Sequence, residues 1–277
     1  MDGRKLKMTV DHQGVTLVGD RFQLTTIGPA EEPNILASDD VMYGLAESAE
    51  MEEVISELQA LTRRSYGQFC GLSRAMEMLG ERWSLLIVRD LLVSPKTVPQ
   101  LQNGLPRIPA DILAARLREF EHAGVLFRHA TSGSAESVRY ELTEYGKELD
   151  DIVLRVGRWG ARQLGEPRPE EIVTTDSMIM AMRATFQPQN AQGVNVSYEL
   201  RLVDIVLNLR IDDGVLMVDA GPLPGADLLF EPGVALKRLM SGEVSAAEVV
   251  RDKNVRLVGD PALVDLFARM FHIGPDV

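Results

Sequence analysis

The sequence predicts an α+β protein with more than one folded unit. Its middle carries helical patterns followed by two short β-rich runs, and its last third carries alternating strands, a strong turn signal and then helices. The length of 277 residues is about twice the commonest domain size. We expect an N-terminal extension over 1–65 and two domains, over 66–164 and over 175–277.

Composition excludes several classes of protein. Apolar residues make up 45% of the chain, but no run reaches the roughly 20 residues of a membrane helix, and residues 1–9 lack the apolar core of a secretion signal. Cys70 is the single cysteine, so no internal disulfide can form. We expect a soluble, cytoplasmic protein with no membrane partner, no cofactor and no metal site, because its four histidines are scattered: His12, His122, His129 and His272.

No catalytic motif is present. The sequence has no Gly-rich phosphate loop, no zinc-binding helix motif and no nucleophile elbow, so we expect a protein that is not an enzyme. The net charge of −12 argues against nucleic acid, but the acidic excess lies in 1–66 and 161–277. Residues 67–160 are neutral, and within them 67–129 are slightly basic.

The N-terminal extension is predicted to begin with strands. Two β-rich runs over 14–27, separated by Gly19-Asp20, predict a hairpin, and the prolines that follow predict a loop. Over 45–64 apolar residues recur at intervals of three and four, which predicts an amphipathic helix. That helix either packs on its own domain or forms a dimer contact; its apolar positions are Met51, Val54, Ile55, Leu58 and Leu61.

The central third is predicted as four helices, a hairpin and a last helix. Two helices over 72–79 and 83–92 are broken at Gly80, and a short helix over 97–102 has Thr97 as its N-cap and a stop at Asn103-Gly104. A fourth helix over 109–123 has Pro109 in its first turn and Gly124 as its C-cap. Strands over 125–131 and 138–142 flank a polar turn over 132–137, and a long helix follows over 144–164.

A short helix, a Gly-containing turn, a second helix and a hairpin form the order of a winged helix-turn-helix. The helix over 109–123 directs Ile112, Leu113, Leu117 and Phe120 inward and small or polar residues outward, which allows close approach to base edges. The alternative is that the arginines are a solvated face and that Arg116 pairs internally. The residues expected to contact DNA are Arg107, Pro109, Ala110, Asp111, Ala114, Ala115, Arg116, Arg118, Arg128 and Arg139.

The segments 70–92, 112–124 and 138–146, including Gly80-Glu-Arg-Trp83 and Arg116-Leu-Arg-Glu119, resemble the HxlR-type winged helix-turn-helix regulators of bacteria. The likeness runs from about Tyr66 to Gly160. It implies a homodimeric transcriptional regulator that binds a double-stranded DNA operator, with the helix from Pro109 as the reader and the hairpin as the wing. Two features depart from the family: Cys70-Gly71 replaces the commoner Cys-Pro, and the wing is rich in Ser and Ala instead of basic residues.

Cys70 is a candidate redox residue. Some members of that family sense oxidants or electrophiles through a cysteine at this place. A helix N-terminus and the nearby Arg74 would lower the thiol pKa. The alternative is a small buried hydrophobe.

The last third is predicted as a sheet with helices. Alternation over 194–201 and 204–211, the turn Asp212-Asp213-Gly214 and a strand over 215–219 predict an antiparallel meander with one apolar face. We then expect a strand over 227–230, helices over 232–240 and 245–250, a strand over 255–258 and a helix over 261–271.

The segments 226–232, 239–248 and 255–263 resemble the sterol-carrier-protein-2-like (SCP2-like) fold. The resemblance implies an apolar tunnel between sheet and helices and a small hydrophobic effector as ligand. The alternative is an ordinary close-packed core. The candidate pocket residues are Met178, Met182, Phe186, Met217, Phe230, Leu236, Met240, Phe267, Met270 and Phe271.

Two functional hypotheses follow. The first is a bacterial DNA-binding transcriptional regulator, dimeric and responsive to a small hydrophobic ligand through its C-terminal domain. The second is a lipid- or metabolite-binding carrier in which the winged helix binds a protein instead of DNA. The neutral charge of residues 67–160 and the plain wing favour the second hypothesis slightly.

Overall fold

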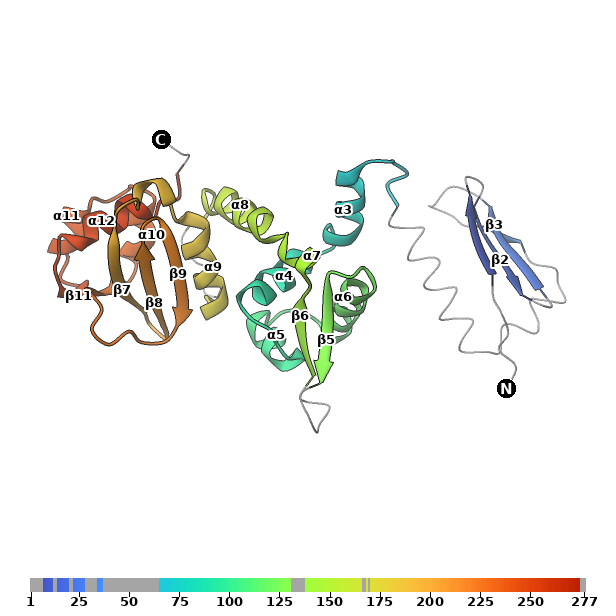
Figure 1. Cartoon of the computed structure of the whole chain (residues 1–277), viewed down its shortest axis with the longest axis horizontal. Helices are drawn as coiled ribbons and strands as arrows, with labels where there is room; N and C mark the ends of the chain where they lie inside the picture. The colour runs from blue at the N-terminus through green and yellow to red at the C-terminus, as the bar shows by residue number, and fades with distance from the viewer. Residues whose placement is uncertain are drawn as a thin grey trace. The chain divides into compact units, whose positions relative to one another are not determined.

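The computed structural model describes the strands of residues 7–36 and then residues 65–130, 138–165, 168 and 170–274. The chain divides into two compact units, Met1–Glu81 and Arg82–Val277. Figure 1 shows the elements of both units.

The first unit contains a four-stranded antiparallel sheet in the order β1-β2-β3-β4. The predicted hairpin is confirmed, because β2 (Gly14–Gly19) pairs antiparallel with β3 (Phe22–Ile27). Its two edge strands, β1 (Lys7–Asp11) and β4 (Asn34–Leu36), were not predicted from the sequence. The helix predicted over 45–64 lies outside the described residues.

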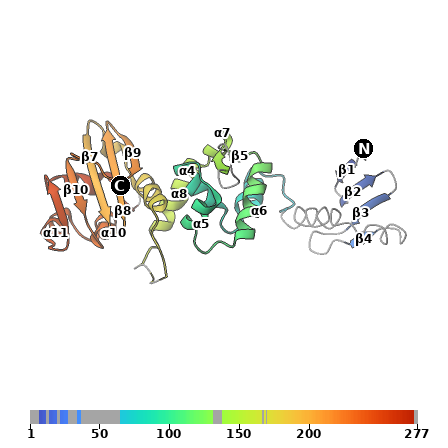
Figure 2. The same cartoon turned by 90° about the horizontal axis from the view of Figure 1, so that it is seen from below.

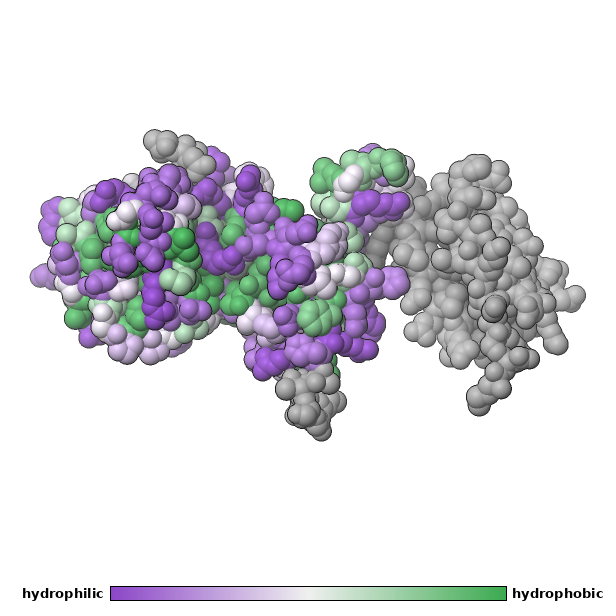
Figure 3. Space-filling view, viewed as in Figure 1, coloured by the Kyte–Doolittle hydropathy of each residue, from purple (hydrophilic) through white to green (hydrophobic). Residues whose placement is uncertain are grey.

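Helix α3 (Gly71–Leu79) ends the first unit and confirms the helix predicted over 72–79. Hydrophobic surface gathers over α3 and the residues that precede it, as Figure 3 shows. Phe69 and Leu72 are the most exposed of these side chains, at 107% and 72%.

The second unit begins with the winged helix-turn-helix, and its helix-turn-helix agrees with the prediction to within two residues. Helix α4 (Ser84–Val93) precedes α5 (Val98–Gly104) and α6 (Ala110–His122), and the hairpin of β5 (Leu126–Ala130) and β6 (Val138–Leu142) follows. The predicted turn over 132–137 lies outside the described residues. Each of these elements contributes buried apolar residues, which include Ile87, Val88, Leu91, Leu101, Leu113, Leu117, Phe120, Leu126 and Leu142.

The long helix predicted over 144–164 is wrong in one respect, since it is two helices, α7 (Glu144–Lys147) and α8 (Asp150–Ala161). The backbone N–H of Leu149 donates to the carbonyl of Gly146 at 3.2 Å, a tighter i,i+3 bond that interrupts the α-helical ladder. Thr143 caps α7: its Oγ1 accepts from the N–H of Gly146 at 3.0 Å and donates to the carbonyl of Gly124 at 2.7 Å.

The rest of the second unit starts with helix α9 (Thr175–Thr185), which the sequence analysis did not predict. A signal was available, because Thr174 and Ser177 form a capping box at its start. The meander is confirmed: β7 (Asn195–Leu202), β8 (Ile205–Asp212) and β9 (Val215–Ala220) pair antiparallel in sequence. The turn residues Asp213 and Gly214 have φ angles of 44° and 83°, the left-handed conformations that their sequence favours.

The five strands lie in the order β11-β10-β7-β8-β9. Strand β10 (Leu228–Glu231) pairs parallel with β7, and β11 (Arg256–Gly259) closes that edge. The remaining helices are α10 (Ala235–Met240), α11 (Ala246–Arg251) and α12 (Leu263–Met270), all near their predicted places. Helices α10 and α11 lie beside the sheet in Figure 2.

One face of this sheet forms the core with the helices. Val196, Tyr198 and Leu200 alternate inward on β7, where side chains of α9, α10 and α12 cover them. The ring of Phe267 stacks on that of Phe271 at 4.5 Å between centroids and meets Tyr198 and Phe230 edge-on at 5.4 Å. Aromatic packing therefore holds α12 against the strands.

Candidate nucleic-acid interface

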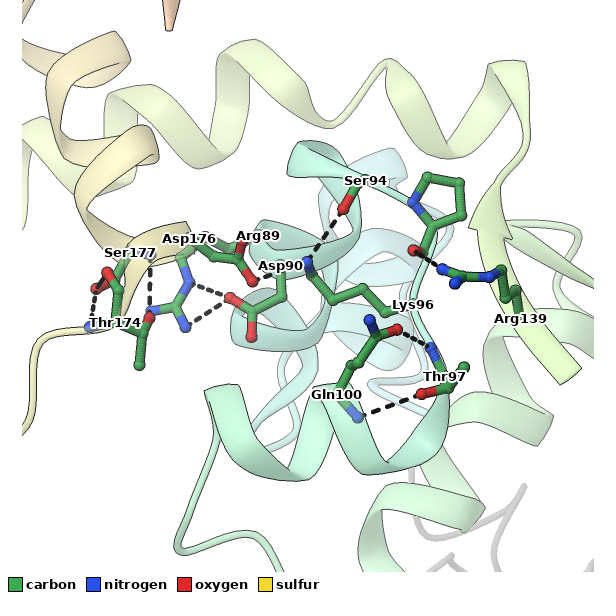
Figure 4. Close-up of polar contacts among 11 residues, drawn as sticks. Arg89, Asp90, Ser94, Lys96, Thr97, Gln100, Arg139, Thr174, Asp176 and Ser177 are labelled. Carbon is green, nitrogen blue, oxygen red and sulfur yellow. Dashed lines mark hydrogen bonds and ion pairs between the residues drawn. The ribbon is translucent and has the colours of Figure 1, made fainter. Parts of the chain in front are cut away.

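Helix α5 is fixed at its start by a capping box. The backbone N–H of Gln100 donates to Oγ1 of Thr97 at 3.4 Å, and the N–H of Thr97 donates to Oε1 of Gln100 at 2.9 Å (Figure 4). These bonds satisfy N–H groups that the helix itself leaves unpaired. Leu101 on the inner side of α5 is fully buried and fixes the position of the helix on the core.

Helix α6 has two unlike faces. Leu113, Leu117 and Phe120 are at most 2% exposed and fix the helix on the core. The opposite face is built of small and polar side chains, and Ala115 at its margin is half-buried. The predicted site residues that lie exposed on or just before this face are Arg107, Pro109, Ala110, Asp111, Ala114 and Arg118.

Three of the five predicted arginines already have partners within the protein. The Arg116 side chain is 8% exposed and pairs with Glu119 at 2.7 Å. This is the internal pairing stated above as the alternative to a DNA contact. Arg128 pairs with Glu121 at 3.1 Å, and Arg139 donates from Nη1 to the carbonyl of Pro95 at 3.2 Å. These contacts brace α6 and the hairpin.

Arg107 and Arg118 differ from those three. Both are exposed, and neither forms an ion pair with any residue that the structure describes. They lie at the turn before α6 and on the outer face of α6, where unpaired guanidinium groups suit phosphate oxygens.

The hairpin is joined to the start of α5. Lys96 and Tyr140 exchange two backbone hydrogen bonds, of 3.0 Å and 2.8 Å, so residue 96 forms an isolated antiparallel β-bridge beside β6. The bond from Arg139 to Pro95 lies next to this bridge. The base of the wing therefore has a set position relative to the helix-turn-helix.

A buried polar cluster, missed by the sequence analysis, connects α4 to α9 (Figure 4). Asp90 is fully buried and accepts from Nε of Arg89 at 2.8 Å, and burial raises the pKa of its carboxyl group. Nζ of Lys96 pairs with Asp176 in the first turn of α9 at 2.8 Å, and both side chains are mostly buried. Because these partners are 80 residues apart in the chain, sequence spacing carries no signal of the pair.

Cys70 is exposed at the N-cap of α3, so the reading as a small buried hydrophobe is wrong. Hydrogen bonds from the backbone N–H groups of Ser73 and Leu72 lower the pKa of its thiol. Exposure and a lowered pKa are both properties of reactive thiols. The redox role stays a prediction.

The candidate pocket residues divide by burial. Eight are at most 9% exposed inside the core of the second sheet, and Met178 is half-buried against it. Met217 is 47% exposed on β9 and does not belong to this core. The eight buried residues are Met182, Phe186, Phe230, Leu236, Met240, Phe267, Met270 and Phe271.

Neither a metal-binding cluster nor a membrane-spanning helix occurs among the described residues. No group of three or more His, Cys, Asp or Glu residues in this part of the chain could hold a metal ion. None of the described helices is long and apolar enough to cross a membrane.

Comparison with known proteins identifies the class. A family model for the HxlR-like helix-turn-helix matches residues 78–168, which include α4 to α8. The chain is 37% identical over 110 residues to Rv3095 of Mycobacterium tuberculosis, a match that covers 40% of this chain and 66% of that relative. It is 33% identical over 89 residues to YtcD of Bacillus subtilis, covering 32% of this chain and 71% of YtcD.

Among solved structures, the reduced form of the transcriptional regulator YodB from B. subtilis matches at 31% identity, over 36% of this chain and 99% of YodB, with a TM-score of 0.31. Both curated relatives are named uncharacterized HTH-type transcriptional regulators, a class of protein without catalytic activity. The chain belongs to the HxlR-like helix-turn-helix family. The expectation of a non-enzymatic regulator is confirmed.

Proposed function

We propose that this protein is a homodimeric regulator that binds double-stranded DNA in the bacterial cytoplasm with α6 in the major groove of a two-fold operator. The outer face of α6 carries this proposal. Ala110 and Ala114 keep that face short enough to approach base edges, while the core holds the opposite face rigid. Arg107 and Arg118 supply charges for phosphates, and Arg128 and Arg139 support the helix and the wing.

The dimer is proposed to form through α8. Ile152, Val156 and Trp159 recur at intervals of four and three on this helix and are 46%, 48% and 70% exposed. Such an apolar stripe on a soluble protein marks an interaction surface. A two-fold dimer would present two copies of α6, which must lie about 34 Å apart to meet successive major grooves.

Residues 175–277 are proposed as an SCP2-like domain that receives a small hydrophobic effector, attached to the DNA-binding domain of residues 66–164. The helices on one face of the sheet support this proposal, as do the apolar residues between them. An effector that favours one arrangement of the two α6 helices would shift DNA affinity by its differential binding to the two states.

The first test of DNA binding is Arg118→Ala. The variant is expected to bind DNA from upstream of its own gene about tenfold more weakly, with a log–log salt slope shallower by about 1, because one phosphate contact is lost. Fluorescence anisotropy between 50 and 200 mM salt measures both quantities. The control is Arg251→Ala on α11, which removes the same charge far along the chain. It is expected to change neither the DNA affinity nor the salt slope.

The alternative function is a lipid- or metabolite-binding carrier whose winged helix contacts a protein. The internal pairing of Arg116, Arg128 and Arg139 favours it, because these arginines have less to offer phosphates. The same titration decides between the two functions. A wild-type protein with no salt-dependent preference for its upstream DNA over a scrambled duplex would support the carrier and contradict the regulator.

A further inference from the structure

A groove of about 400 Å³ opens beside the turn that leads into α6. Three stretches of chain form it: the start of α4, the end of α5 with its following turn, and the segment that enters α9. Its volume falls within the range of small-molecule sites. Its lining includes Trp83, Leu86, Arg107, Glu170, Glu171 and Ile172.

Part of this lining is exposed apolar surface. Trp83 is half-buried, and Leu86 and Ile172 are 40% and 59% exposed. Trp83 has a left-handed φ of 80°, and the guanidinium of Arg82 lies 5.1 Å from the centre of its ring. An apolar ligand that covered these side chains would gain the free energy of removing them from water.

The charges of the groove favour an anion at one end. Arg107 is exposed and has no ion-pair partner among the described residues, whereas Arg89 is occupied by Asp90 at 2.7 Å. The N-terminus of α9, at Thr174 and Ser177, adds positive potential.

Two carboxylates oppose this charge. Glu171 is partly neutralised by Arg168. Its Oε2 accepts from the backbone N–H of Arg168 at 2.9 Å, and its Oε1 lies 3.8 Å from Nε of the Arg168 guanidinium. Glu170 is exposed and forms no ion pair within the described part of the chain. Glu170 is therefore the lining acid whose charge is least compensated by neighbouring groups.

We propose that the groove binds a small apolar carboxylic acid, with the carboxylate paired to Arg107 and the apolar body against Trp83, Leu86 and Ile172. The role assigned to this ligand rests on the proposed DNA-binding function. Arg107 lies three residues before the first residue of α6, so a bound acid neutralises a guanidinium offered to DNA phosphate and occupies the turn that positions the helix. Acid and DNA therefore compete.

The groove has fixed walls. The 2.8 Å ion pair of Lys96 with Asp176 holds the start of α9 to the loop before α5. On the other side, the carboxylate of Asp90 lies against Gly104, where a Cβ atom would be 2.5 Å from Oδ2. A ligand that binds between walls held in this way pays little for ordering the site.

The test uses the full chain carrying Trp159→Phe, which leaves Trp83 as the only tryptophan. Its fluorescence is titrated with 4-phenylbutyrate and with two matched probes, 4-phenylbutan-1-ol and 4-phenylbutylamine. We expect the acid to change Trp83 emission with an affinity about tenfold higher than that of either probe, since only the acid offers a charged acceptor to Arg107.

Substitutions assign the contacts. Arg107→Ala is expected to reduce the affinity for the acid to that for the alcohol. Glu170→Gln is expected to raise the affinity for the acid about threefold, because it removes a like charge. Arg118→Ala is the matched control, another unpaired arginine outside the groove, and is expected to leave acid binding unchanged. Equal affinities for acid and alcohol, tighter binding of the amine, or no change in emission up to 10 mM would overturn the proposal.

The link to DNA is measured separately. Saturating 4-phenylbutyrate is expected to weaken DNA binding by the wild-type protein about tenfold. It is expected to leave the DNA affinity of Arg107→Ala unchanged. If the acid binds at Trp83 and leaves DNA affinity unchanged, the proposed competition is wrong. If the protein binds no DNA, the proposed function fails while the fluorescence titration still decides the groove.

Discussion

Ala114→Glu is expected to abolish specific DNA binding while the protein stays folded. Ala114 is exposed near the middle of the outer face of α6, where a longer acidic side chain would hold the helix away from base edges and face phosphate charge. Like charges brought together at an interface cost several kcal/mol, so a loss of at least about 100-fold in affinity is expected. Fluorescence anisotropy with upstream DNA measures it.

The matched control is Ala247→Glu, which places the same side chain at an exposed alanine of α11. Both variants are expected to keep the wild-type free energy of unfolding within about 0.5 kcal/mol, because exposed helix positions tolerate such changes. Equal DNA affinities of Ala114→Glu and the wild type would exclude α6 as the reading helix.

Gly146→Ala is expected to give a large loss of stability. A Cβ atom at this position in α7 would lie 2.0 Å from the carbonyl oxygen of Val125, a backbone atom that cannot rotate away. The same carbonyl accepts the N–H of Thr143 at 3.0 Å, so a shift would also strain the junction of hairpin and helix. Overpacking of this kind costs about 3 kcal/mol, which urea unfolding followed by circular dichroism would detect.

Gly157→Ala provides the comparison within α8. There the nearest atom to an added Cβ is the Cβ of Ala184 at 3.9 Å, an ordinary contact. The substitution is expected to leave stability unchanged or to raise it by up to about 1 kcal/mol, because alanine favours the helix. If both variants lost the same stability, the close approach of α7 to Val125 would not be the cause.

The helices of the central third could be predicted because their end signals are local. Thr97 with Gln100, and Gly124 after α6 with a φ of +70°, determine where two of them begin or end. The inner face of α6 was equally clear from its spacing, since Leu113, Leu117 and Phe120 are all buried.

The contacts that could not be predicted from the sequence join residues that are far apart in the chain. Arg128, Arg139 and Arg118 look alike in a list of basic residues, yet only Arg118 is without an ion-pair or hydrogen-bond partner among the described residues. The Lys96–Asp176 pair and the groove beside Arg107 arise where segments about 60 to 90 residues apart meet. Such long-range contacts leave no periodic pattern in the local sequence.

Two copies of α6 are proposed to read one operator. Hydroxyl-radical footprinting of the protein on DNA from upstream of its own gene tests it most directly. We expect two protected segments related by two-fold symmetry, with their centres about one helical turn, or 34 Å, apart, and no protection by Ala114→Glu. Uniform protection along the duplex, or none at protein concentrations that saturate anisotropy, would contradict it.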